Sequence, residues 1–582
     1  MANKATQLKK NEMPLTNQTP NINRYNYLIA IFIFNFYTKS AYPVDISSGS
    51  ILQGIQSQVS TFNLPHANSI LETVNENFND GKGIKFTLNQ IKFTGNYKIT
   101  DLDLQTIIAK YLNHPITFNE LRYITDEVVQ YYRVHGILAR AVLPEQEVTN
   151  GVLSVLIIEA TLGGVLIDNK SKRVDKKRIE TWIYSVIPVG SKLSLVALER
   201  ALLTLNDQPD LQVTSSLGEG QNHGETLLIL TVTDKPLIKG SITTDNYGQS
   251  STGNNRASLN FNLNGFFQIG EELNFFGLYT RGSSYNRLAI NLPANSSGLR
   301  AGLNTSYLYY EISNPSFSQL YLNGTSSTAG AEFSYPLRRS RPTNLYISGN
   351  YNFSTFTNSA NLSTISQYNT SVYQTGLFAN SLDNILRGGV NSSSLIISNG
   401  LVNLNTSPSL AFDVIGPQIN GGFSKLRYSV NRNQFINSYV SAYLGLTGQL
   451  ASKNLDASEQ IYFGGPYAVR AYATGQANAS QGEIMTFELS QVLPMGLTLT
   501  EFYDYSNVQT FKDINFQGAP PQNSYSLQGV GSSLGWIGDA GIKIKATLAI
   551  PTGSIPPTIK QTLTGNGGYS SNRLWLTATL PF

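Results

Sequence analysis

One arginine and one aspartate in the C-terminal part of the chain could form a strong ion pair. Arg470 follows a Gly464-Gly465-Pro466 loop, whereas Asp504 follows residues 497–500, an alternating segment that is typical of a strand with one apolar face. A guanidinium matches a carboxylate bidentately, and such a pair is strong where water is partly excluded. Two unrelated, solvated charges would explain the same residues. The pairing therefore depends on the elements that position the two side chains.

The composition favours a membrane β-barrel. Charged residues make up 13% of the 582 residues and aromatic residues 11%, while Gly, Ser, Thr and Asn are abundant. Low charge without a long apolar segment is typical of strands that alternate lipid-facing apolar residues with small, polar residues facing a lumen. The formal net charge of +4 is small for this length, and no basic stripe with interleaved aromatic residues is present. We therefore expect a mostly uncharged, polar lumen and no nucleic-acid partner.

Residue types that catalyse reactions or bind metals are scarce. The chain has no cysteine, which excludes disulfides, thiol nucleophiles and cysteine-based zinc sites. The four histidines are scattered and do not form an HExxH motif. The glycines at 529 and 531 open toward a strand instead of a helix, so they do not form a dinucleotide-binding loop. We expect no enzymatic activity, no metal and no cofactor.

The N-terminus predicts export across the inner membrane. Lys4, Lys9, Lys10 and Arg24 precede an apolar run from Tyr27 to Tyr37, which small residues follow. A run of about 11 residues fits the core of a signal peptide and is too short for a spanning helix. We interpret residues 1–41 as a signal peptide, and the alternative is a buried apolar segment of a soluble protein. The absence of cysteine also fits passage through an oxidising periplasm.

A short amphipathic helix is predicted after the signal peptide, within residues 47–62. Its apolar positions fall on one helical stripe, while the opposite face consists of Gln, Ser and Gly. Residues 63–83 are rich in Asn and lack periodicity, which indicates a linker. The residues of the stripe are Ile51, Leu52, Ile55 and Val59.

Two tandem units of one kind follow the linker. Residues 84–161 and residues 162–234 each show the order strand, helix, helix, strand, strand. A repeat of this size indicates a small domain that has been duplicated, because solenoids are built from at least three shorter units.

The remainder of the chain, residues 235–582, alternates apolar and polar residues with a period of two. Spans of 9 to 11 residues with turns and longer loops accommodate about sixteen strands in this length. The final strand, 574–582, is amphipathic and ends on an aromatic residue, the usual mark for insertion into an outer membrane. We assign Trp575, Leu580 and Phe582 to this C-terminal insertion signal.

Several motifs resemble those of a known family. In the two units they are Leu143-Pro144-Glu145-Gln146 and Leu205-Asn206-Asp207-Gln208-Pro209, and Asp245-Asn246-Tyr247-Gly248 stands where the barrel begins. A loop tetrad similar to Val-Arg-Gly-Tyr and a strand motif similar to Phe-x-Asp-x-Gly come later in the chain. They comprise Val469, Arg470, Ala471 and Tyr472 in the loop, and Phe502, Asp504 and Ser506 in the strand. Together the motifs resemble the outer-membrane transporters of two-partner secretion, the haemolysin secretion/activation family of ShlB/FhaC/HecB type.

Two positions depart from the family pattern. Ala471 and Ser506 stand where the family usually has glycine. Glycine is used where φ is positive or where backbones approach closely, so the tip of the loop could sit differently here. Alanine and serine are small, and we therefore expect the pair of Arg470 and Asp504 to survive.

The resemblance implies a fold and a location. The fold consists of α+β POTRA (polypeptide-transport-associated) domains plus an all-β part. Two tandem periplasmic β-α-α-β-β POTRA domains precede a 16-stranded transmembrane antiparallel β-barrel, and an N-terminal plug helix occupies its lumen. The loop that carries Arg470 is expected to fold into this lumen and to pair with Asp504 on the wall. The expected location is the Gram-negative outer membrane.

The resemblance also implies a function and partners. The expected partner is a secreted β-helical exoprotein of haemolysin or adhesin type, recognised unfolded by the POTRA domains and exported without ATP. Outer-membrane lipid and the assembly machinery are the other expected partners. An outer-membrane assembly factor of the same superfamily is one alternative, although such factors usually carry more POTRA units. A passive, porin-like channel is the other, and it would leave the two periplasmic units without a purpose.

Overall fold

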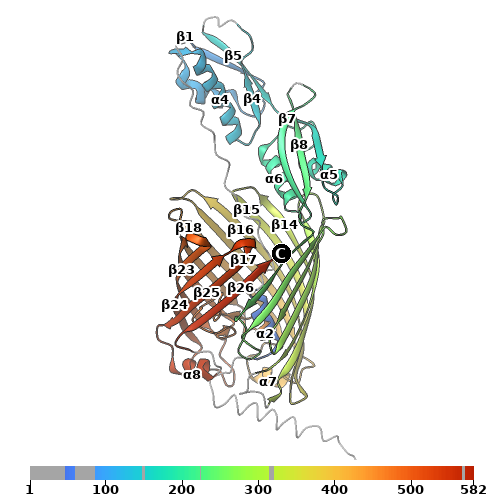
Figure 1. Cartoon of the computed structure of the whole chain (residues 1–582), viewed down its shortest axis with the longest axis vertical. Helices are drawn as coiled ribbons and strands as arrows, with labels where there is room; N and C mark the ends of the chain where they lie inside the picture. Colours follow the sequence, from blue (N-terminus) through green and yellow to red (C-terminus); the bar gives the residue numbers. More distant parts are fainter. Residues whose placement is uncertain (1–45, 59–84, 147–150, 223, 314–319, 566–569) are drawn as a thin grey trace, which may run out of the picture.

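The computed structural model describes residues 46–58, 85–146, 151–222, 224–313, 320–565 and 570–582. It consists of two small α/β units in tandem, a closed barrel and a helix inside the barrel (Figure 1). The predicted signal peptide, 1–41, and the predicted linker, 63–83, lie outside the described residues. The predicted fold class, two POTRA-type units before a 16-stranded barrel with an N-terminal helix, is confirmed.

The first unit packs two helices on a three-stranded sheet of order β2-β5-β4. The side chain of Thr100 caps α3, and Thr117 forms a capping box with Glu120 at the start of α4. The segment expected as one strand from residue 84 is divided between β1 and β2, and β1 pairs with β3. The elements are β1 Lys85–Thr87, β2 Gln90–Thr94, α3 Asp101–Ile108, η1 Ala109–Tyr111, β3 Pro115–Thr117, α4 Phe118–Val134, β4 Ala139–Val142 and β5 Val152–Glu159.

The second unit repeats this arrangement with a sheet of order β6-β8-β7. Asp175 and Ser194 accept backbone N–H groups at the starts of its two helices. Trp182 lies in the apolar core between the helices and the sheet, and its indole N–H donates to Thr204 Oγ1 at 3.2 Å. The elements are β6 Thr161–Asn169, α5 Lys176–Val186, α6 Leu195–Asn206, β7 Leu211–Glu219 and β8 Glu225–Asp234.

The barrel is closed by antiparallel pairing between neighbours in the chain and finally between β26 and β9. Closure pairs the backbone groups of every strand, as a lipid environment requires. Its strands are β9 Ile238–Asp245, β10 Arg256–Asn264, β11 Glu272–Tyr279, β12 Ser283–Pro293, β13 Arg300–Glu311, β14 Asn323–Arg339, β15 Thr343–Ala360, β16 Ser363–Asp383, β17 Gly389–Asn403, β18 Gly421–Phe435, β19 Val440–Ala451, β22 Gln481–Leu493, β23 Leu497–Gln509, β24 Ser524–Ile537, β25 Lys543–Thr552 and β26 Arg573–Pro581.

Short elements connect these strands or lie inside the barrel. They are α2 Ser48–Gln56, α7 Leu410–Ile415, η3 Ala457–Glu459, β20 Ile461–Tyr462, β21 Asn478–Ala479, η4 Pro494–Gly496, η5 Asp539–Gly541 and α8 Pro557–Gly565. In Figure 1, α2 lies within the barrel toward the end that carries α7 and α8, and the two POTRA-type units extend from the opposite end. No helix among the described residues is long and apolar enough to span a membrane.

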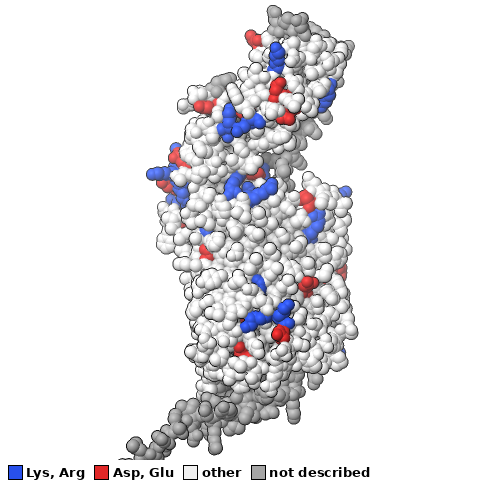
Figure 2. All heavy atoms as spheres, turned by 180° about the vertical axis from the view of Figure 1, so that it is seen from behind, with Lys and Arg blue, Asp and Glu red and all other residues white. Residues whose placement is uncertain are grey.

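The outer wall of the barrel is apolar. Large apolar side chains are exposed at every second position of many strands, for example Leu395 and Ile397 in β17. Figure 2 shows few charged atoms on the visible barrel wall, and Lys and Arg gather near its junction with the second unit. This pattern is that of a lipid-facing surface.

The lumen differs from the uncharged, polar interior that the sequence predicted. Lys425 pairs with Glu459 at 2.6 Å, and Arg287 lies 3.6 Å from Glu332. Around α2, moreover, the inner wall is apolar, with Leu308 and Phe356 buried in one cluster. The expectation was wrong because charged residues can pair with one another inside the lumen and because strands such as β13 carry apolar residues on both faces.

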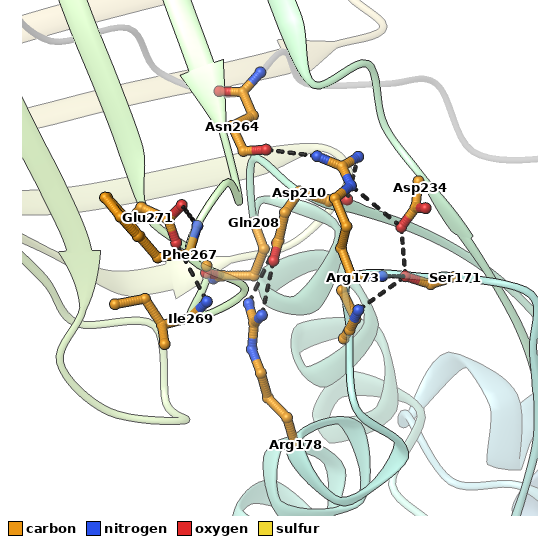
Figure 3. Close-up of polar contacts among 12 residues, drawn as sticks. Ser171, Arg173, Arg178, Gln208, Asp210, Asp234, Asn264, Phe267, Ile269 and Glu271 are labelled. Carbon is orange, nitrogen blue, oxygen red and sulfur yellow. Dashed lines mark hydrogen bonds and ion pairs between the residues drawn. The ribbon is translucent and has the colours of Figure 1, made fainter.

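The second unit is clamped onto the rim of the barrel by the turn between α6 and β7. Arg339, at the end of β14, donates from Nε and Nη2 to the two carboxylate oxygens of Asp207 at 2.8 and 2.9 Å. Arg300 of β13 donates to Gln208 Oε1 at 3.0 Å. In Figure 3, Arg173 reaches the Asn264 carbonyl oxygen of β10, at 2.5 Å. Contacts from three strands therefore fix the orientation of this unit.

Within the second unit, a buried ion pair stiffens the same turn. Arg178 of α5 donates to both carboxylate oxygens of Asp210 at 2.7 and 3.2 Å, as Figure 3 shows. The Asp210 side chain is fully buried. A Cβ added at Gly265, in the turn between β10 and β11, would lie 2.3 Å from Asp210 Cβ, so glycine is needed where barrel and unit meet.

Replacing Arg339 with alanine should loosen this docking. The loss of two charge-assisted hydrogen bonds should cost roughly 1.5–3 kcal/mol of docking free energy. Because the chain has no native cysteine, spin labels on cysteines introduced at the exposed Thr181 and Asn384 report the distance between α5 and the barrel rim. We expect a broader distance distribution in Arg339→Ala. Arg341→Ala is the control, because its contact with Glu199 is 3.5 Å long and largely solvated; equal distributions in both variants would contradict the clamp.

Candidate functional site

The connection between β19 and β22 folds into the barrel and is almost wholly buried. We call residues 452–480 the lumen loop; it contains η3 and the paired β20 and β21. The Gly464-Gly465-Pro466 segment forms a tight turn within it. A Cβ at Gly464 would lie 2.5 Å from the Ala473 carbonyl oxygen, and Gly465 has a φ of +125°. This turn directs the following residues, including Arg470, toward the wall of the barrel.

The structure brings Arg470 and Asp504 together. Arg470 donates from Nε to Asp504 Oδ2 at 2.8 Å and from Nη2 to Oδ1 at 2.7 Å, and its backbone N–H donates to Oδ2 at 3.0 Å. Arg470 is 6% exposed, and Asp504, on the lumen side of β23, is fully buried. The bidentate geometry and the exclusion of water make this pair a strong, directional contact.

Three further contacts of Arg470 were not predicted from the sequence. Nη1 donates to Glu488 Oε1 of β22 at 2.6 Å, and Cζ lies 3.5 Å from the centre of the Phe502 ring. The Trp575 indole N–H of β26 donates to the Arg470 carbonyl oxygen at 2.7 Å. A guanidinium, two carboxylates, a phenyl ring and an indole thus form one cluster, which we call the latch.

The alternation of residues along β22 indicates the face of the strand on which Glu488 lies. Met485 and Phe487 are exposed on the outer wall, so Glu488 falls on the lumen face, directly opposite Phe502 in the register. Without the strand register, however, the sequence does not show that Glu488 lies beside Arg470, which is eighteen residues away in the chain.

The neighbours of Arg470 in the tetrad are buried as well. Val469 and Tyr472 lie in the apolar core of the lumen loop, where the Val469 N–H donates to the Phe463 carbonyl oxygen at 2.9 Å. Ala471 stands where the resemblance led us to expect glycine. Its methyl group fits because Gly529 of β24 lies opposite: a Cβ at Gly529 would be 2.6 Å from Ala471 Cβ. Gly529 thus leaves the space that the methyl group of Ala471 occupies.

Ser506 is the second departure from the family motif. It is fully buried on β23, and its hydroxyl has no hydrogen-bond partner among the described residues. The serine therefore neither supports the latch nor displaces Asp504, which accepts a further hydrogen bond from Thr486 Oγ1 at 3.2 Å.

The predicted plug helix is observed as α2, Ser48–Gln56, and is shorter than the predicted segment 47–62. Ser47 caps it through a capping box with Ser50. Ile51, Leu52 and Ile55 are buried against apolar residues of the inner wall. Val59 lies outside the described residues.

Polar contacts tie α2 to the wall and to the lumen loop. The Ser48 N–H donates to Asn358 Oδ1 of β15 at 2.7 Å, and the Tyr462 hydroxyl of the lumen loop donates to the Ser50 carbonyl oxygen at 2.5 Å. The helix and the loop are therefore held together as one assembly inside the barrel.

The three residues assigned to the C-terminal insertion signal lie on two faces of β26. Leu580 and Phe582 are exposed on the outer wall, whereas Trp575 is 3% exposed and faces the latch. Successive side chains of a regular strand point to opposite faces. The odd-numbered Trp575 therefore cannot face outward together with the even-numbered Leu580 and Phe582. Phe582 also closes the barrel, because its N–H and C=O both pair with Gly240 of β9, at 3.0 and 2.9 Å.

The arrangement holds a loop in place. Among the described residues, no group of three or more His, Asp or Glu side chains could hold a metal ion. The segment 531–535 has the spacing Gly-x-Ser-x-Gly, yet it lies inside β24, where Ser533 Oγ is 2.8 Å from Thr547 Oγ1. A nucleophile of that motif would sit at a strand-to-helix turn. The contacts of the latch thus fix the position of the lumen loop against the wall of the barrel.

Family profiles match both parts of the chain. The profile described as "Haemolysin secretion/activation protein ShlB/FhaC/HecB" matches residues 224–558, and the profile "POTRA domain, ShlB-type" matches residues 86–160. The first covers more than half of the chain, including the lumen loop and the strands β22 and β23, which carry all residues of the latch except Trp575.

Two relatives match along most of their length. The heme/hemopexin transporter protein HuxB of Haemophilus influenzae (strain ATCC 51907) is 25% identical over 472 residues, 79% of this chain and 82% of the relative. The outer membrane transporter CdiB of Dickeya dadantii is 24% identical over 487 residues, 80% and 84% of the two chains.

Solved structures share the fold. CdiB from Escherichia coli superposes with a TM-score of 0.66 at 17% identity, covering 98% of this chain and 100% of the other. BamA from Haemophilus ducreyi lacking POTRA domains 1–3 has a TM-score of 0.51 at 14% identity, covering 85% and 100%.

Gly529→Ala should disturb the latch, because the new methyl group would meet Ala471. Overpacking of this kind costs roughly 1–3 kcal/mol. We expect faster proteolysis of the lumen loop. We also expect the gel band of the folded barrel to disappear at a lower temperature than in the wild type. The double variant Ala471→Gly with Gly529→Ala should recover both. Gly535→Ala is the matched control on β24, since its added Cβ would meet only the Thr498 carbonyl oxygen, at 3.8 Å; equal effects at both glycines would refute the packing argument.

Proposed function

The chain belongs to the haemolysin secretion/activation family, and from this premise we propose that its latch controls the export of one secreted exoprotein. It is an outer-membrane translocator of two-partner secretion, with POTRA domains in the periplasm. The observation that carries the proposal is a loop held inside the lumen by Arg470, which obstructs the path that a client must take. The domain limits we propose are 84–161 and 162–234 for the POTRA domains and 235–582 for the barrel.

The proposed client is an unfolded exoprotein of haemolysin or adhesin type that becomes a β-helix outside the cell. The matching family is described as haemolysin secretion/activation proteins, and one relative is described as an outer membrane transporter, which supports a secreted client. Outer-membrane lipid surrounds the barrel, and we propose that the assembly machinery inserts it through the C-terminal strand with Leu580 and Phe582. We propose no catalysis and no cofactor.

The energy for export comes from the client in this proposal. The chain lacks a Gly-x-x-x-x-Gly-Lys-Ser/Thr loop, and the outer membrane has no nucleotide supply. A client that crosses unfolded and folds outside cannot slip back, so its folding free energy makes the transfer directional. The barrel needs only to open a path and to close it afterwards.

The plug and the latch are the proposed closing elements. The helix α2 lies in the part of the lumen that is turned away from the POTRA domains, and its apolar stripe is buried against the wall. Beside it, the Tyr462 hydroxyl links the lumen loop to α2. We propose that both move when a client enters and that the latch returns the loop to its place.

The alternative of an assembly factor draws on the fold shared with BamA. It is less well supported, because the matching family profile is that of secretion proteins. A passive channel accounts for neither the POTRA domains nor the latch.

Deletion of the gene in its own organism tests the proposal. The proteins of the culture medium are compared between wild type, deletion strain and complemented strain. We expect one large protein with a signal peptide to disappear from the medium and to return on complementation; we call it the client. An unchanged set of released proteins would overturn the proposed function.

Arg470→Ala should reduce release of the client at least about tenfold while the barrel still inserts. Removing one partner of a buried pair costs roughly 3–5 kcal/mol, less where water reaches the site, and leaves Asp504 uncompensated. The lumen loop then lacks the contact that returns it to its place after a client enters, so it can stay misplaced in the path. Client in the medium is quantified against transporter in the outer membrane. Arg281→Ala, at an exposed arginine, serves as the control with normal release. Normal release by Arg470→Ala would refute the role of the latch.

Deletion of residues 47–62 should raise the ion conductance of the barrel in planar bilayers, because α2 fills apolar space in the lumen. Replacement of residues 63–78, within the predicted linker, by an equally long Gly/Ser segment is the control, because it keeps the length of chain that joins α2 to the first POTRA domain, and it should leave conductance near that of the wild type. If the deletion of residues 47–62 also gave the wild-type conductance, α2 would not be a plug.

A further inference from the structure

The outer wall of the barrel has a groove on the strands β15 to β18, with a volume of about 270 Å³. Its floor consists of two small residues, Ala379 of β16 and Ser393 of β17, which lie opposite each other in the strand register. Larger side chains stand around this floor. They include Leu345, Leu377, Leu395 and Val430.

The strand register shows where on the barrel the groove lies. Leu345 pairs with Arg338 of β14, and the next residue, Arg339, binds Asp207 of the second POTRA domain. The groove is therefore near the end of the barrel from which the POTRA domains extend (Figure 1). Leu395 belongs to the exposed apolar face of β17, so the groove opens toward lipid on the periplasmic side of the membrane.

A polar cluster borders the groove on its periplasmic side. Arg432 of β18 donates from Nη1 to Asp383 Oδ2 at 2.6 Å and from Nη2 to Oδ1 at 3.1 Å. Nη1 also donates to Asn391 Oδ1 at 2.7 Å, and Nε donates to Gln434 Oε1 at 3.1 Å. Asn391 shares the outward face of β17 with Ser393, two residues further on. Because charge on a lipid-facing wall costs least near the interface, this cluster marks the level at which head groups begin.

Two arginines beside this cluster are free to bind an anion. Arg338 ends the row that leads into the groove through Leu345, and Arg387 lies in the turn that joins β16 to β17. Both are exposed, and neither forms an ion pair with a described residue. Carboxylates of the same rim are already paired: Asp207 with Arg339, Glu199 with Arg341 and Asp383 with Arg432. The rim thus carries an excess of positive charge at the mouth of the groove.

We propose that this groove is a binding site for one anionic phospholipid of the periplasmic leaflet. One acyl chain lies over Ala379 and Ser393, and the phosphate faces Arg338 and Arg387. A guanidinium matches the geometry of a phosphate, and basic residues at the edge of a membrane protein attract anionic lipids. The site is separate from the lumen and does not depend on the identity of the client.

The order of the chemical groups along the wall supports this ligand. An apolar groove is followed by the neutral cluster around Arg432 and then by free cations, and a phospholipid has the same order of chain, glycerol esters and phosphate. The acyl chain of any phospholipid can fill the groove, because lipid tails are alike in polarity. Selection between lipids therefore rests on the charge of the head group.

The test compares two matched positions on the outer wall. Ile397 is 50% exposed just beyond the groove, and Ile550 of β25 is 44% exposed on the other side of the barrel, at a similar distance from the start of its strand. Each is replaced in turn by the only cysteine of the chain and labelled with bimane. The full-length transporter is placed in vesicles of phosphatidylethanolamine that contain a small fraction of phosphatidylglycerol with brominated chains. Bromine quenches dyes that it touches, so we expect stronger quenching at 397 than at 550.

Substitutions then separate the groove from the charges. Ser393→Leu fills the floor and should reduce quenching at 397 to the level at 550, whereas Ala546→Leu, on the outward face of β25, should not. For Arg338→Gln and for Arg387→Gln, we expect the fraction of phosphatidylglycerol that gives half-maximal quenching at 397 to rise about fivefold. Arg281→Gln, at an exposed arginine of the opposite rim, is the control and should leave it unchanged.

Three outcomes would overturn the inference. Equal quenching at 397 and 550 in the otherwise unchanged transporter would show that no site exists, and this comparison requires no variant that could misfold. Equal quenching by brominated phosphatidylethanolamine and by brominated phosphatidylglycerol would exclude selection of an anionic head group. Unchanged half-maximal quenching in both arginine variants would remove Arg338 and Arg387 from the site.

Discussion

The buried guanidinium of Arg470 is the constraint on which the closed barrel depends. A charge removed from bulk water must keep its partners, and here they come from three strands: Glu488 on β22, Asp504 on β23, and Trp575 on β26, which binds the backbone of the same residue. The lumen loop can leave only if all three contacts are given up together. These polar contacts add to the apolar packing of Val469 and Tyr472 against the wall, and together they hold the loop in one place.

A second constraint acts at the other end of the transport path. The proposed delivery of a client by the POTRA domains requires a fixed position of these domains relative to the barrel. The turn after α6 provides it, because Asp207 and Gln208 bind the barrel rim through Arg339 and Arg300. Inside the barrel, the apolar contacts of α2 hold this helix against the inner wall.

The sequence predicted those features that depend on local chemistry. Period-two alternation and the length of residues 235–582 predicted sixteen strands, and helical stripes between alternating segments predicted two units with the same order of elements. The pairing of Arg470 with Asp504 could be predicted because both stand in motifs. Glu488 and Trp575 could not, since only the strand register places them beside the loop. The apolar lumen around α2 was missed because Tyr307, Leu308 and Tyr309 are apolar in succession, so alternation does not tell inner from outer face.

Arg470 and Asp504 should act as one unit, and a double-mutant cycle on client release tests this most directly. Release is measured for Arg470→Ala, Asp504→Ala and the variant with both, each normalised to barrel in the outer membrane. Coupled residues give strongly non-additive effects. We predict that the double variant releases no less client than the more impaired single variant. Losses that multiply, as expected of two independent residues, would contradict a latch built on this pair.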